Sequence, residues 1–358
     1  SAMVKAGSYL FLRLSPAMAT EGLIGPAVAL LGGVTFGGAA LLALRERDLK
    51  RILALSTVSS LGLIAASAGL GTPAGLAAGA LLLAFHAVAK ALAFLVVGAI
   101  EQSTGRRDVE ALVGVIRRRP RLAGAFLVAA AAMALPPFGL AVAKWAILVL
   151  GARELVLVVL LAVGGAASLA LWTGVTARLL VRRAVARDEA REGLPWTERS
   201  AVGALSLAAV AGLVLAGPVA ALMADPAAQV AFGRDAGLAA GWSIALAGSG
   251  FAVPAVAVLV AVAIVLAAIV AGRIPAVSRQ PYLAGANLAP GSAVTFHGVR
   301  GQPVEATSGG FYWGAGLDGA LRPAVPARLL VLAGWAATAL VVGAAFAVWA
   351  LPPSGGMP

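Results

Sequence analysis

The chain has 358 residues, of which 61% are hydrophobic and only 12% are charged, and its mean hydropathy is +0.97. So apolar a composition excludes a soluble domain of this length and is typical of a polytopic membrane protein. The absence of cysteine excludes disulfides and iron–sulfur ligation, and two histidines leave little for haem or zinc. We therefore expect no cofactor and no metal in this chain, so that any redox chemistry must lie on other subunits.

Windows of about 20 apolar residues predict nine membrane crossings, the first of them partial. They lie near residues 1–14, 22–44, 49–70, 75–100, 121–150, 155–177, 200–224, 247–272 and 328–351. The predicted fold class is therefore all-α, a polytopic transmembrane helix bundle in a lipid bilayer. Because Ser1 already stands inside an apolar segment, we expect an N-terminal part to be missing.

The net charge of +12 does not indicate a nucleic-acid partner, because the chain has no soluble basic domain with interleaved aromatic residues. The basic residues instead alternate between the two sides of the predicted bundle. One side carries 21 of the 27 lysines and arginines, at residues 45–51, 106–121, 178–199 and 273–328, and the other side carries Arg13, Arg153 and Arg234. By the positive-inside rule the basic loops face the cytoplasm, and we expect a multi-pass protein of the cell (inner) membrane.

The predicted span at 121–150 contains a break and a lysine. The break is formed by Pro136, Pro137 and Gly139. The two prolines remove amide donors, so that carbonyls near Ala132 and Met133 lose their helical partners in the middle of the membrane. Lys144 lies two turns beyond, at a depth where a lysine costs roughly 2.5 to 3.5 kcal/mol on insertion scales. So costly a charge indicates a functional site beside a broken helix.

Other polar residues in the spans have two explanations each. His86 and Lys90 stand four residues apart and share one helix face, where both can reach one water-filled seam. A histidine can instead be a core residue bonded to a backbone carbonyl. Lys5 lies near the start of its segment, where a lysine can snorkel to the membrane surface. Lys50 follows Asp48 at the mouth of the third span, where a solvated or headgroup-facing charge is an equally good explanation.

Three lysines inside apolar spans have a shared chemical consequence. Desolvation and neighbouring cations both disfavour the ammonium form, so that such lysines can take up and release protons, and histidine titrates near neutrality. The acidic residues stand at helix ends or in loops, which leaves the lysines without intramembrane carboxylates. The pattern predicts a proton relay formed by Lys5, His86, Lys90 and Lys144, with Lys50 and Asp48 in the relay or at its mouth.

Four stretches, in order, resemble the signatures of the antiporter-like proton-pumping subunits of the respiratory complex I superfamily, which also occur in Mrp antiporters and energy-converting membrane-bound hydrogenases. They are DLKRILALSTVSSLG at 48–62, FHAVAKALAFLVVGA at 85–99, TGRRDVEALVGV at 104–115 and LPPFGLAVAK at 135–144. The resemblance implies that Lys5 is the central-helix lysine, that His86 and Lys90 form the middle of the relay, and that Lys144 is the terminal proton site. Lys50 matches the lysine of the family's DLKR.

The family folds as two inverted five-helix repeats, and the resemblance implies an antiporter-like fold that holds the second repeat and the tail of the first. We expect that tail at 1–21, the second repeat at 22–177, additional transmembrane helices at 178–272, a cytoplasmic loop at 273–327 and a C-terminal transmembrane helix at 328–358. Many members have S-G-F-x-S-K after the prolines, whereas this chain reads GLAVAK and so lacks hydroxyls that would hold water. Beyond residue 150 the match is looser and resembles the C-terminal extensions of hydrogenase-type subunits.

The resemblance and the predicted relay together imply a proton-translocating membrane subunit of a redox-driven complex, hydrogenase-like or NADH:quinone oxidoreductase-like. Such a subunit is not itself catalytic. Its expected partners are other membrane subunits and a peripheral redox module. Two alternatives remain open: an Mrp-type cation/proton antiporter subunit without a redox partner, and a structural membrane anchor whose lysines are inert.

Overall fold

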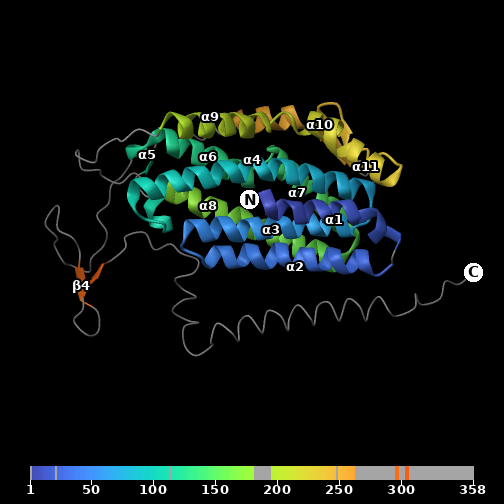
Figure 1. The fold of residues 1–358 in the computed structure, drawn as a ribbon, viewed down its shortest axis with the longest axis horizontal. Coiled ribbons are helices and arrows are strands. Elements are labelled where there is room, and N and C mark those ends of the chain that lie inside the picture. Colours follow the sequence, from blue (N-terminus) through green and yellow to red (C-terminus); the bar gives the residue numbers. More distant parts are fainter. Residues whose placement is uncertain are drawn as a thin grey trace, which may run out of the picture.

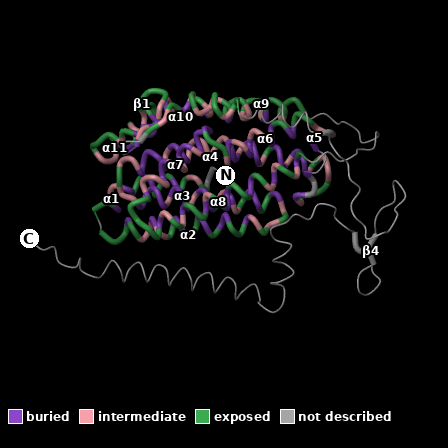
Figure 2. Tube along the Cα trace, turned by 180° about the vertical axis from the view of Figure 1, so that it is seen from behind, coloured by how far each residue is buried: buried purple, intermediate pink, exposed green. Residues whose placement is uncertain are grey.

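Long antiparallel helices form a bundle in the computed structural model, which describes residues 2–20, 22–112, 115–180, 195–246, 249–262, 295–297 and 303–305. In Figure 1, α2 lies along one edge of the bundle and α9 along the other, with α3 and α4 between them. The buried residues concentrate on the inner faces of the central helices (Figure 2). This arrangement confirms the predicted all-α bundle.

The bundle helices are α1 (Ala2–Thr20), α2 (Ile24–Arg45), α3 (Leu49–Gly69), α4 (Pro73–Thr104), α6 (Pro120–Ala134), α7 (Gly139–Leu150) and α8 (Leu155–Leu180). Short turns of helix join them: η1 (Val109–Leu112), α5 (Val115–Arg118) and η2 (Gly151–Arg153). Next come α9 (Trp196–Ala211), α10 (Ala216–Val219), the π-helical turn η3 (Ala220–Ala224) and α11 (Asp225–Phe232). Strands β1 (Ala239–Ala240), β2 (Ser243–Leu246) and β3 (Ser249–Ala252) pair in order as an antiparallel sheet, and β4 (Thr295–His297) pairs with β5 (Pro303–Glu305).

Five segments of the described chain are long and apolar enough to cross a membrane. They are Ile24–Arg45, Leu49–Gly69, Pro73–Thr104, Pro120–Arg153 and Leu155–Leu180. Each corresponds to one of the windows predicted between residues 22 and 177, which confirms those windows as helices. The predicted loop at 273–327 lies outside the described residues apart from β4 and β5, and the predicted helix at 328–358 lies wholly outside them.

Helix α4 is the central helix of the bundle, and its ends follow from the local sequence. The Thr72 hydroxyl caps the first turn by accepting from the Gly75 amide at 3.0 Å, and Pro73 fits the first helical position, where no amide donor is needed. Gly105 ends the helix in the left-handed region, at φ 66°, which glycine adopts without penalty. Because the helix has 32 residues, His86 and Lys90 both stand near its middle.

Small residues let α2 and α3 approach until their backbones touch. A Cβ atom added to Gly25 would lie 2.8 Å from the Gly69 carbonyl oxygen, and one added to Gly62 would lie 2.7 Å from the Phe36 amide nitrogen. Close backbone contact of this kind is how membrane helices associate without a hydrophobic driving force between them. The α2–α3 pair therefore forms a firm support for the polar residues that α3 presents to α4.

The first two basic loops lie at the same end of the bundle, as the charge pattern predicts. The backbone amide of Leu49 donates to the Arg107 carbonyl at 2.8 Å, and that of Val109 donates to the Arg47 carbonyl at 2.9 Å. The end of α8 reaches this region as well, since it packs against η1 and α5. Three of the four predicted basic segments therefore begin at one end of the molecule.

The apolar window predicted as one span near 200–224 does not form one continuous helix. The helix stops at Ala211 and resumes at Ala216, and the two parts meet at an angle of 91°. The second part packs so closely on the turn between β1 and β2 that a Cβ atom on Gly217 would lie 2.6 Å from the Gly241 carbonyl oxygen. The apolar run through this bend contains no charge, so hydropathy alone does not reveal it.

The window predicted near 247–272 also starts differently from the prediction. Its first described residues form β3, which pairs with β2, and an apolar helix begins only at Val253 and is described as far as Val262. The remainder of this window lies outside the described residues.

We predict that Thr104, the last residue of α4, and Gly233, directly after α11, face opposite sides of the membrane. Figure 1 places α11 and the α5 region at opposite ends of the bundle. Single cysteines introduced at these positions into the cysteine-free chain should react with a membrane-impermeant maleimide from opposite sides of sealed vesicles. Labelling of both from one side would contradict this topology.

Candidate functional site

The broken helix supplies the first polar element of the candidate site. In a continuous helix the amide of Pro137 would serve the Met133 carbonyl, but proline has no amide hydrogen. Instead, the Lys144 ammonium on α7 donates to the Met133 carbonyl oxygen on α6 at 3.0 Å. The predicted break at Pro136 and Pro137 is present between the two half-helices. Lys144, which follows the break, donates to the carbonyl that the break leaves without a helical partner.

A hydroxyl from a third helix completes the surroundings of the partly buried Lys144. Its Nζ lies 3.3 Å from the Oγ of Ser168, a buried residue of α8. The lysine thereby connects α6, α7 and α8. Sequence reasoning did not identify Ser168, which stands alone in an apolar stretch; the only hint was that the half-helix beginning at Gly139 brings no hydroxyl of its own before Lys144.

Lys90 is completely buried at the centre of the bundle. Its ammonium donates to the Leu53 carbonyl oxygen at 2.9 Å and also to the Ser56 hydroxyl, both on α3. The ring of Trp172 on α8 lies on another side, with its centroid 5.6 Å from Nζ. Ammonium groups are attracted to the face of an aromatic ring, most strongly to tryptophan. Lys90 is thus held by three acceptors that carry no formal charge.

Neither Lys90 nor Lys144 takes part in an ion pair in the part of the chain that the structure describes. The ion pairs there involve arginines and Lys50 at the bundle end. A lysine locked to a buried carboxylate would keep its proton, because separating two buried opposite charges is expensive. Carbonyl and hydroxyl partners leave each lysine able to exist in both protonation states.

His86 lies one helical turn before Lys90 and is also completely buried. Both of its ring nitrogens lack a hydrogen-bond partner among the described residues. The alternative of a histidine bonded to a backbone carbonyl therefore has no support from this geometry. Buried polar groups are usually satisfied by protein or by internal water, so His86 is a place where water would be stabilised.

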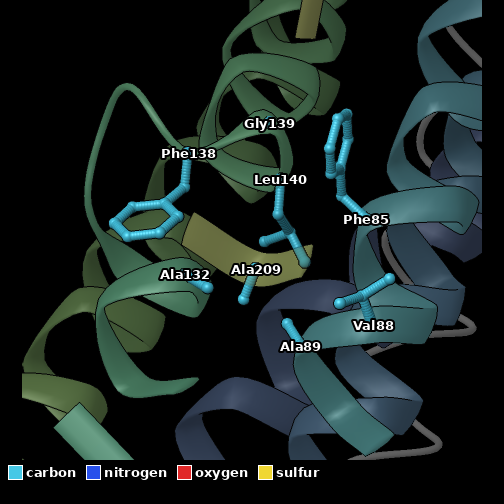
Figure 3. Close-up of a pocket in the computed structure, with 8 residues that line it drawn as sticks. All are labelled: Phe85, Val88, Ala89, Ala132, Phe138, Gly139, Leu140 and Ala209. Atoms are coloured by element: carbon cyan, nitrogen blue, oxygen red, sulfur yellow. The ribbon is translucent and has the colours of Figure 1, made fainter. Parts of the chain in front are cut away.

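A small cavity lies at the helix break, beside the face of α4 that carries Phe85, Val88 and Ala89 (Figure 3). It is lined by Phe85, Val88, Ala89, Ala132, Phe138, Gly139, Leu140 and Ala209. Its volume of about 10 Å³ is close to what a single water molecule requires. The lining is apolar apart from backbone atoms, so the cavity by itself does not form a binding site for a larger solute.

The interruption between α6 and α7 and the bend after α9 lie next to each other beside this cavity. The Gly139 amide, at the start of α7, donates to the Gly212 carbonyl, at the bend after α9, at 3.1 Å. The ring of Phe85 packs against both glycines. The broken helix and the bent helix pair are therefore connected through one hydrogen bond and one aromatic side chain.

The remaining relay candidate, Lys5, lies partly buried on α1. Helix α1, which carries Lys5, and α7, which carries Lys144, both pack against α4, which carries His86 and Lys90. The four predicted residues therefore lie on α4 and on two helices that pack against it. Their role as a relay remains a prediction, because arrangement alone does not measure proton movement.

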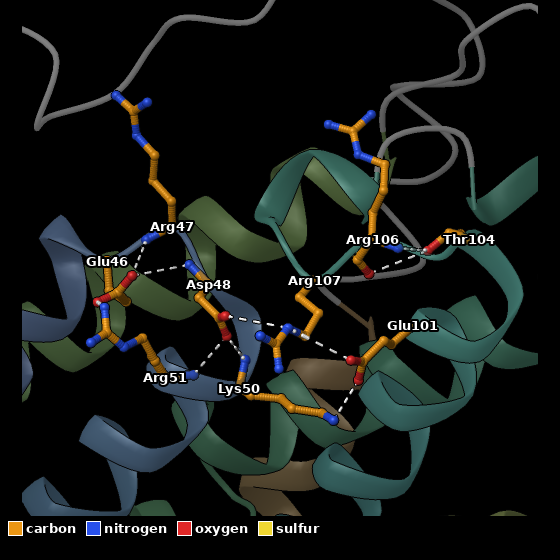
Figure 4. Close-up of polar contacts among 9 residues, drawn as sticks. All are labelled: Glu46, Arg47, Asp48, Lys50, Arg51, Glu101, Thr104, Arg106 and Arg107. Atoms are coloured by element: carbon orange, nitrogen blue, oxygen red, sulfur yellow. Dashed lines mark hydrogen bonds and ion pairs between the residues drawn. The ribbon is translucent and has the colours of Figure 1, made fainter.

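Lys50 and Asp48 occupy a different place, at the bundle end (Figure 4). Asp48 caps α3, accepting from the amides of Lys50 at 2.8 Å and Arg51 at 3.1 Å, a contact type worth about 1 kcal/mol. Lys50 forms an ion pair with Glu101, and Arg107 lies between Glu101 and Asp48, at 3.7 and 3.8 Å respectively. Exposed ion pairs contribute only about 0–1 kcal/mol each. This network joins the ends of α3 and α4 and does not reach Lys90.

No group of three or more His, Cys, Asp or Glu side chains placed to hold a metal ion occurs among the described residues. The polar groups described around Lys90 and Lys144 are amines, an imidazole, hydroxyls and backbone carbonyls. Of these, the amines and the imidazole can bind protons, whereas the carbonyls only accept hydrogen bonds.

Comparison with known proteins identifies this arrangement. Residues 1–169 match the family described as NADH:quinone oxidoreductase/Mrp antiporter, TM. This matched part, just under half of the chain, is similar to the antiporter-like membrane subunits of the complex I superfamily. The matched region contains all four residues of the predicted relay and ends within α8.

Two subunits from Staphylococcus aureus are among the similar curated proteins. The Na(+)/H(+) antiporter subunit A1 of strain bovine RF122 is 39% identical over 151 residues, which cover 38% of this chain and 19% of the relative. The subunit of the same name from strain JH9 is 38% identical over 151 residues, which again cover 38% of this chain and 19% of the relative. The chain therefore spans about a fifth of the length of the curated relatives it matches.

Solved structures share the fold. A chain of the Mrp complex from Dietzia sp. DQ12-45-1b matches with a TM-score of 0.55 and 25% identity, covering 100% of this chain and 38% of that one. A chain of the archaeal membrane-bound sulfane sulfur reductase matches with a TM-score of 0.56 and 21% identity, covering 64% and 47%. A chain of respiratory complex I from Thermus thermophilus matches with a TM-score of 0.56 and 23% identity, covering 64% and 49%.

We predict that Gly139→Ala destabilises the protein, because the added Cβ would overlap the ring of Phe85. Overpacking of a well-filled interior costs about 1–3 kcal/mol, so the thermal unfolding midpoint in detergent should fall. Gly124→Ala is the matched control, since a Cβ there meets nothing within 4 Å and alanine favours helix over glycine by about 0.5–1 kcal/mol. Equal midpoints for the two variants would show that the contact between Phe85 and Gly139 is not tight.

Proposed function

We propose that this chain is the proton-translocating part of an Mrp-type cation/proton antiporter subunit, working with other membrane subunits and without a redox partner. The observation that carries the proposal is the interior itself, where Lys90 and Lys144 are held by carbonyl and hydroxyl oxygens and His86 has no hydrogen-bond partner within the described chain. Groups in such surroundings can gain and lose protons without breaking a buried ion pair.

Two comparisons favour an Mrp-type subunit over the redox-driven subunit predicted from the sequence. The two curated proteins described above are named as Na(+)/H(+) antiporter subunits. The match to a chain of the Dietzia Mrp complex covers 100% of this chain, whereas the matches to the sulfane sulfur reductase and to complex I cover 64% and, at their low identity, support the fold alone. A hydrogenase-like or quinone-reducing partner stays a prediction without support from these comparisons.

The proposed path runs across the bundle interior from Lys5, through His86 and Lys90 on α4, to Lys144 at the helix break. Water stabilised by His86 would join the stations, since the side chains are fixed on separate helices. Like charges on neighbouring lysines repel one another, so a proton that arrives at one station favours release from the next. The basic end of the bundle would face the cytoplasm, in accordance with the positive-inside rule.

The test is cation-driven proton exchange in the absence of any electron donor. Inverted vesicles that contain the full-length gene product and its partner subunits receive an artificial pH gradient, and a pH-sensitive dye reports the change when NaCl or KCl is added. We expect one of these salts to dissipate the gradient. Exchange that requires a reductant would instead support the redox-driven complex, and no exchange under either condition would support an inert anchor.

We predict that the identity of residue 144 decides proton exchange through its ability to change charge. Arginine keeps the charge and nearly the length of lysine but is always protonated, so Lys144→Arg should block exchange. Lys144→Met should block it too, whereas Lys144→Glu, which can titrate when buried, should retain partial exchange.

The measurement is the initial rate of dye response in the same vesicles, with the amount of assembled subunit determined for each variant. An arginine variant that exchanges at the parent rate would show that Lys144 is a fixed electrostatic element and not a proton carrier.

A further inference from the structure

Ser56 occupies a special position among the partners of Lys90. Its hydroxyl accepts from the Lys90 ammonium and itself lies 3.0 Å from the Leu53 carbonyl oxygen, to which it donates. Lys90 donates to the same carbonyl at 2.9 Å. The three groups form a closed triangle in which the hydroxyl hydrogen points to the carbonyl and the hydroxyl lone pair points to the ammonium. Ser56 is buried, so bulk water does not replace either contact.

The two oxygen partners of Lys90 differ in what they can do after the lysine loses a proton. A neutral amine has a lone pair that needs a hydrogen-bond donor, and the Leu53 carbonyl can only accept. A serine hydroxyl can both donate and accept, and its hydrogen rotates to suit its neighbours. The Ser56 hydroxyl can therefore turn its hydrogen from the Leu53 carbonyl to the Lys90 nitrogen, while the remaining amine hydrogens still serve the carbonyl.

We propose that Ser56 is a positioning residue for proton transfer, one that holds Lys90 in the same place in its charged and its neutral form. No bond other than the hydrogen bonds changes in this step, and the released proton passes to the next carrier on the path. A buried amine without a donor would pay the desolvation cost of an unsatisfied polar group. Ser56 removes this cost and so lowers the barrier to proton release. The inference rests on the proposed function, because it concerns how one station of that path works.

Within the described chain, the Ser56 hydroxyl is the hydroxyl that forms a hydrogen bond with Lys90. The other titratable groups that act on Lys90 from packed helices are Lys5 on α1 and Lys144 on α7, both cationic when protonated, and His86 lies one turn away on α4. Helix α3 adds Lys50 and Arg51 only at its first turn, and α8 contributes the uncharged ring of Trp172. None of these side chains carries a hydroxyl that could donate to the neutral Lys90 nitrogen.

Helix α3 also supplies a matched control. Ser59 is buried to a similar degree, with 4% of its surface exposed against 7% for Ser56. Its hydroxyl donates to the Phe36 carbonyl at 2.9 Å, so that Ser59→Ala removes a buried serine hydrogen bond without touching a lysine. Ser56→Thr keeps the hydroxyl and is the conservative variant.

The experiment measures cation-driven exchange in vesicles for Ser56→Ala, Ser56→Thr and Ser59→Ala. Loss of the hydroxyl donor that the neutral Lys90 amine needs predicts that Ser56→Ala lowers the maximal rate about tenfold, with the apparent affinity for the cation unchanged. Ser56→Thr should restore most of the rate, and Ser59→Ala should match the parent. Equal rates for Ser56→Ala and Ser59→Ala would overturn the proposal.

A second measurement does not depend on transport. The thermal unfolding midpoints of Ser56→Ala, Lys90→Met and the double variant form a mutant cycle in detergent. We expect Ser56→Ala to lower the midpoint of the parent but not that of Lys90→Met. A parent that shows no exchange, together with this coupling, would contradict the proposed function and with it the role of Ser56 in proton transfer. Additive midpoints would show that Ser56 and Lys90 do not interact, and would overturn the proposal whatever the vesicles show.

Discussion

The hydrogen bond from Lys144 to the Met133 carbonyl is the interaction on which the rest of this structure depends. Consecutive prolines stop α6 and leave carbonyls without helical partners inside an apolar bundle, where an unsatisfied carbonyl is costly. A buried lysine is costly for the same reason. Each group satisfies the other, at 3.0 Å, so that a break and a charge which are both unfavourable alone become a stable pair. The same pairing explains why a membrane helix can carry a cation without a carboxylate.

The bundle around this pair is built to bring helices close together. Glycines allow the backbones of α2 and α3 to touch, and α3 in turn presents the Leu53 carbonyl and the Ser56 hydroxyl to Lys90. On the other side, the Gly139 amide meets the Gly212 carbonyl, which ties the broken helix to the bent pair. Small residues thus close the contacts between α2 and α3 and between the broken helix and the bent pair.

Much of this could be predicted from the sequence, because the strongest signals are local. Hydropathy located the five spans between residues 24 and 180, the prolines placed the helix break, and the i, i+4 spacing put His86 and Lys90 on one face. The missing amide donors of the two prolines also predicted free carbonyls near Ala132 and Met133, and the Met133 carbonyl indeed accepts from Lys144.

The features that sequence reasoning missed are those that depend on packing between helices. Ser56, Ser168 and Trp172 contact lysines from other helices, and no pattern within α3 or α8 reveals which serine faces inwards. The 91° bend after Ala211 is invisible to hydropathy because the residues on both sides of it are apolar. Lys50 and Asp48, which the sequence places in the relay or at its mouth, form a helix cap and ion pairs at the bundle end, and their part in proton movement stays a prediction.

The central claim is that the buried amines carry protons, and Lys90→Ala tests it most directly. Alanine fits the alanine-rich face of α4 and removes a costly charge, so assembly should survive. The measurement is cation-driven proton exchange in vesicles that contain equal amounts of assembled parent and variant complex. The account predicts that exchange is lost in the variant; exchange at the parent rate would show that protons take a path that does not include Lys90.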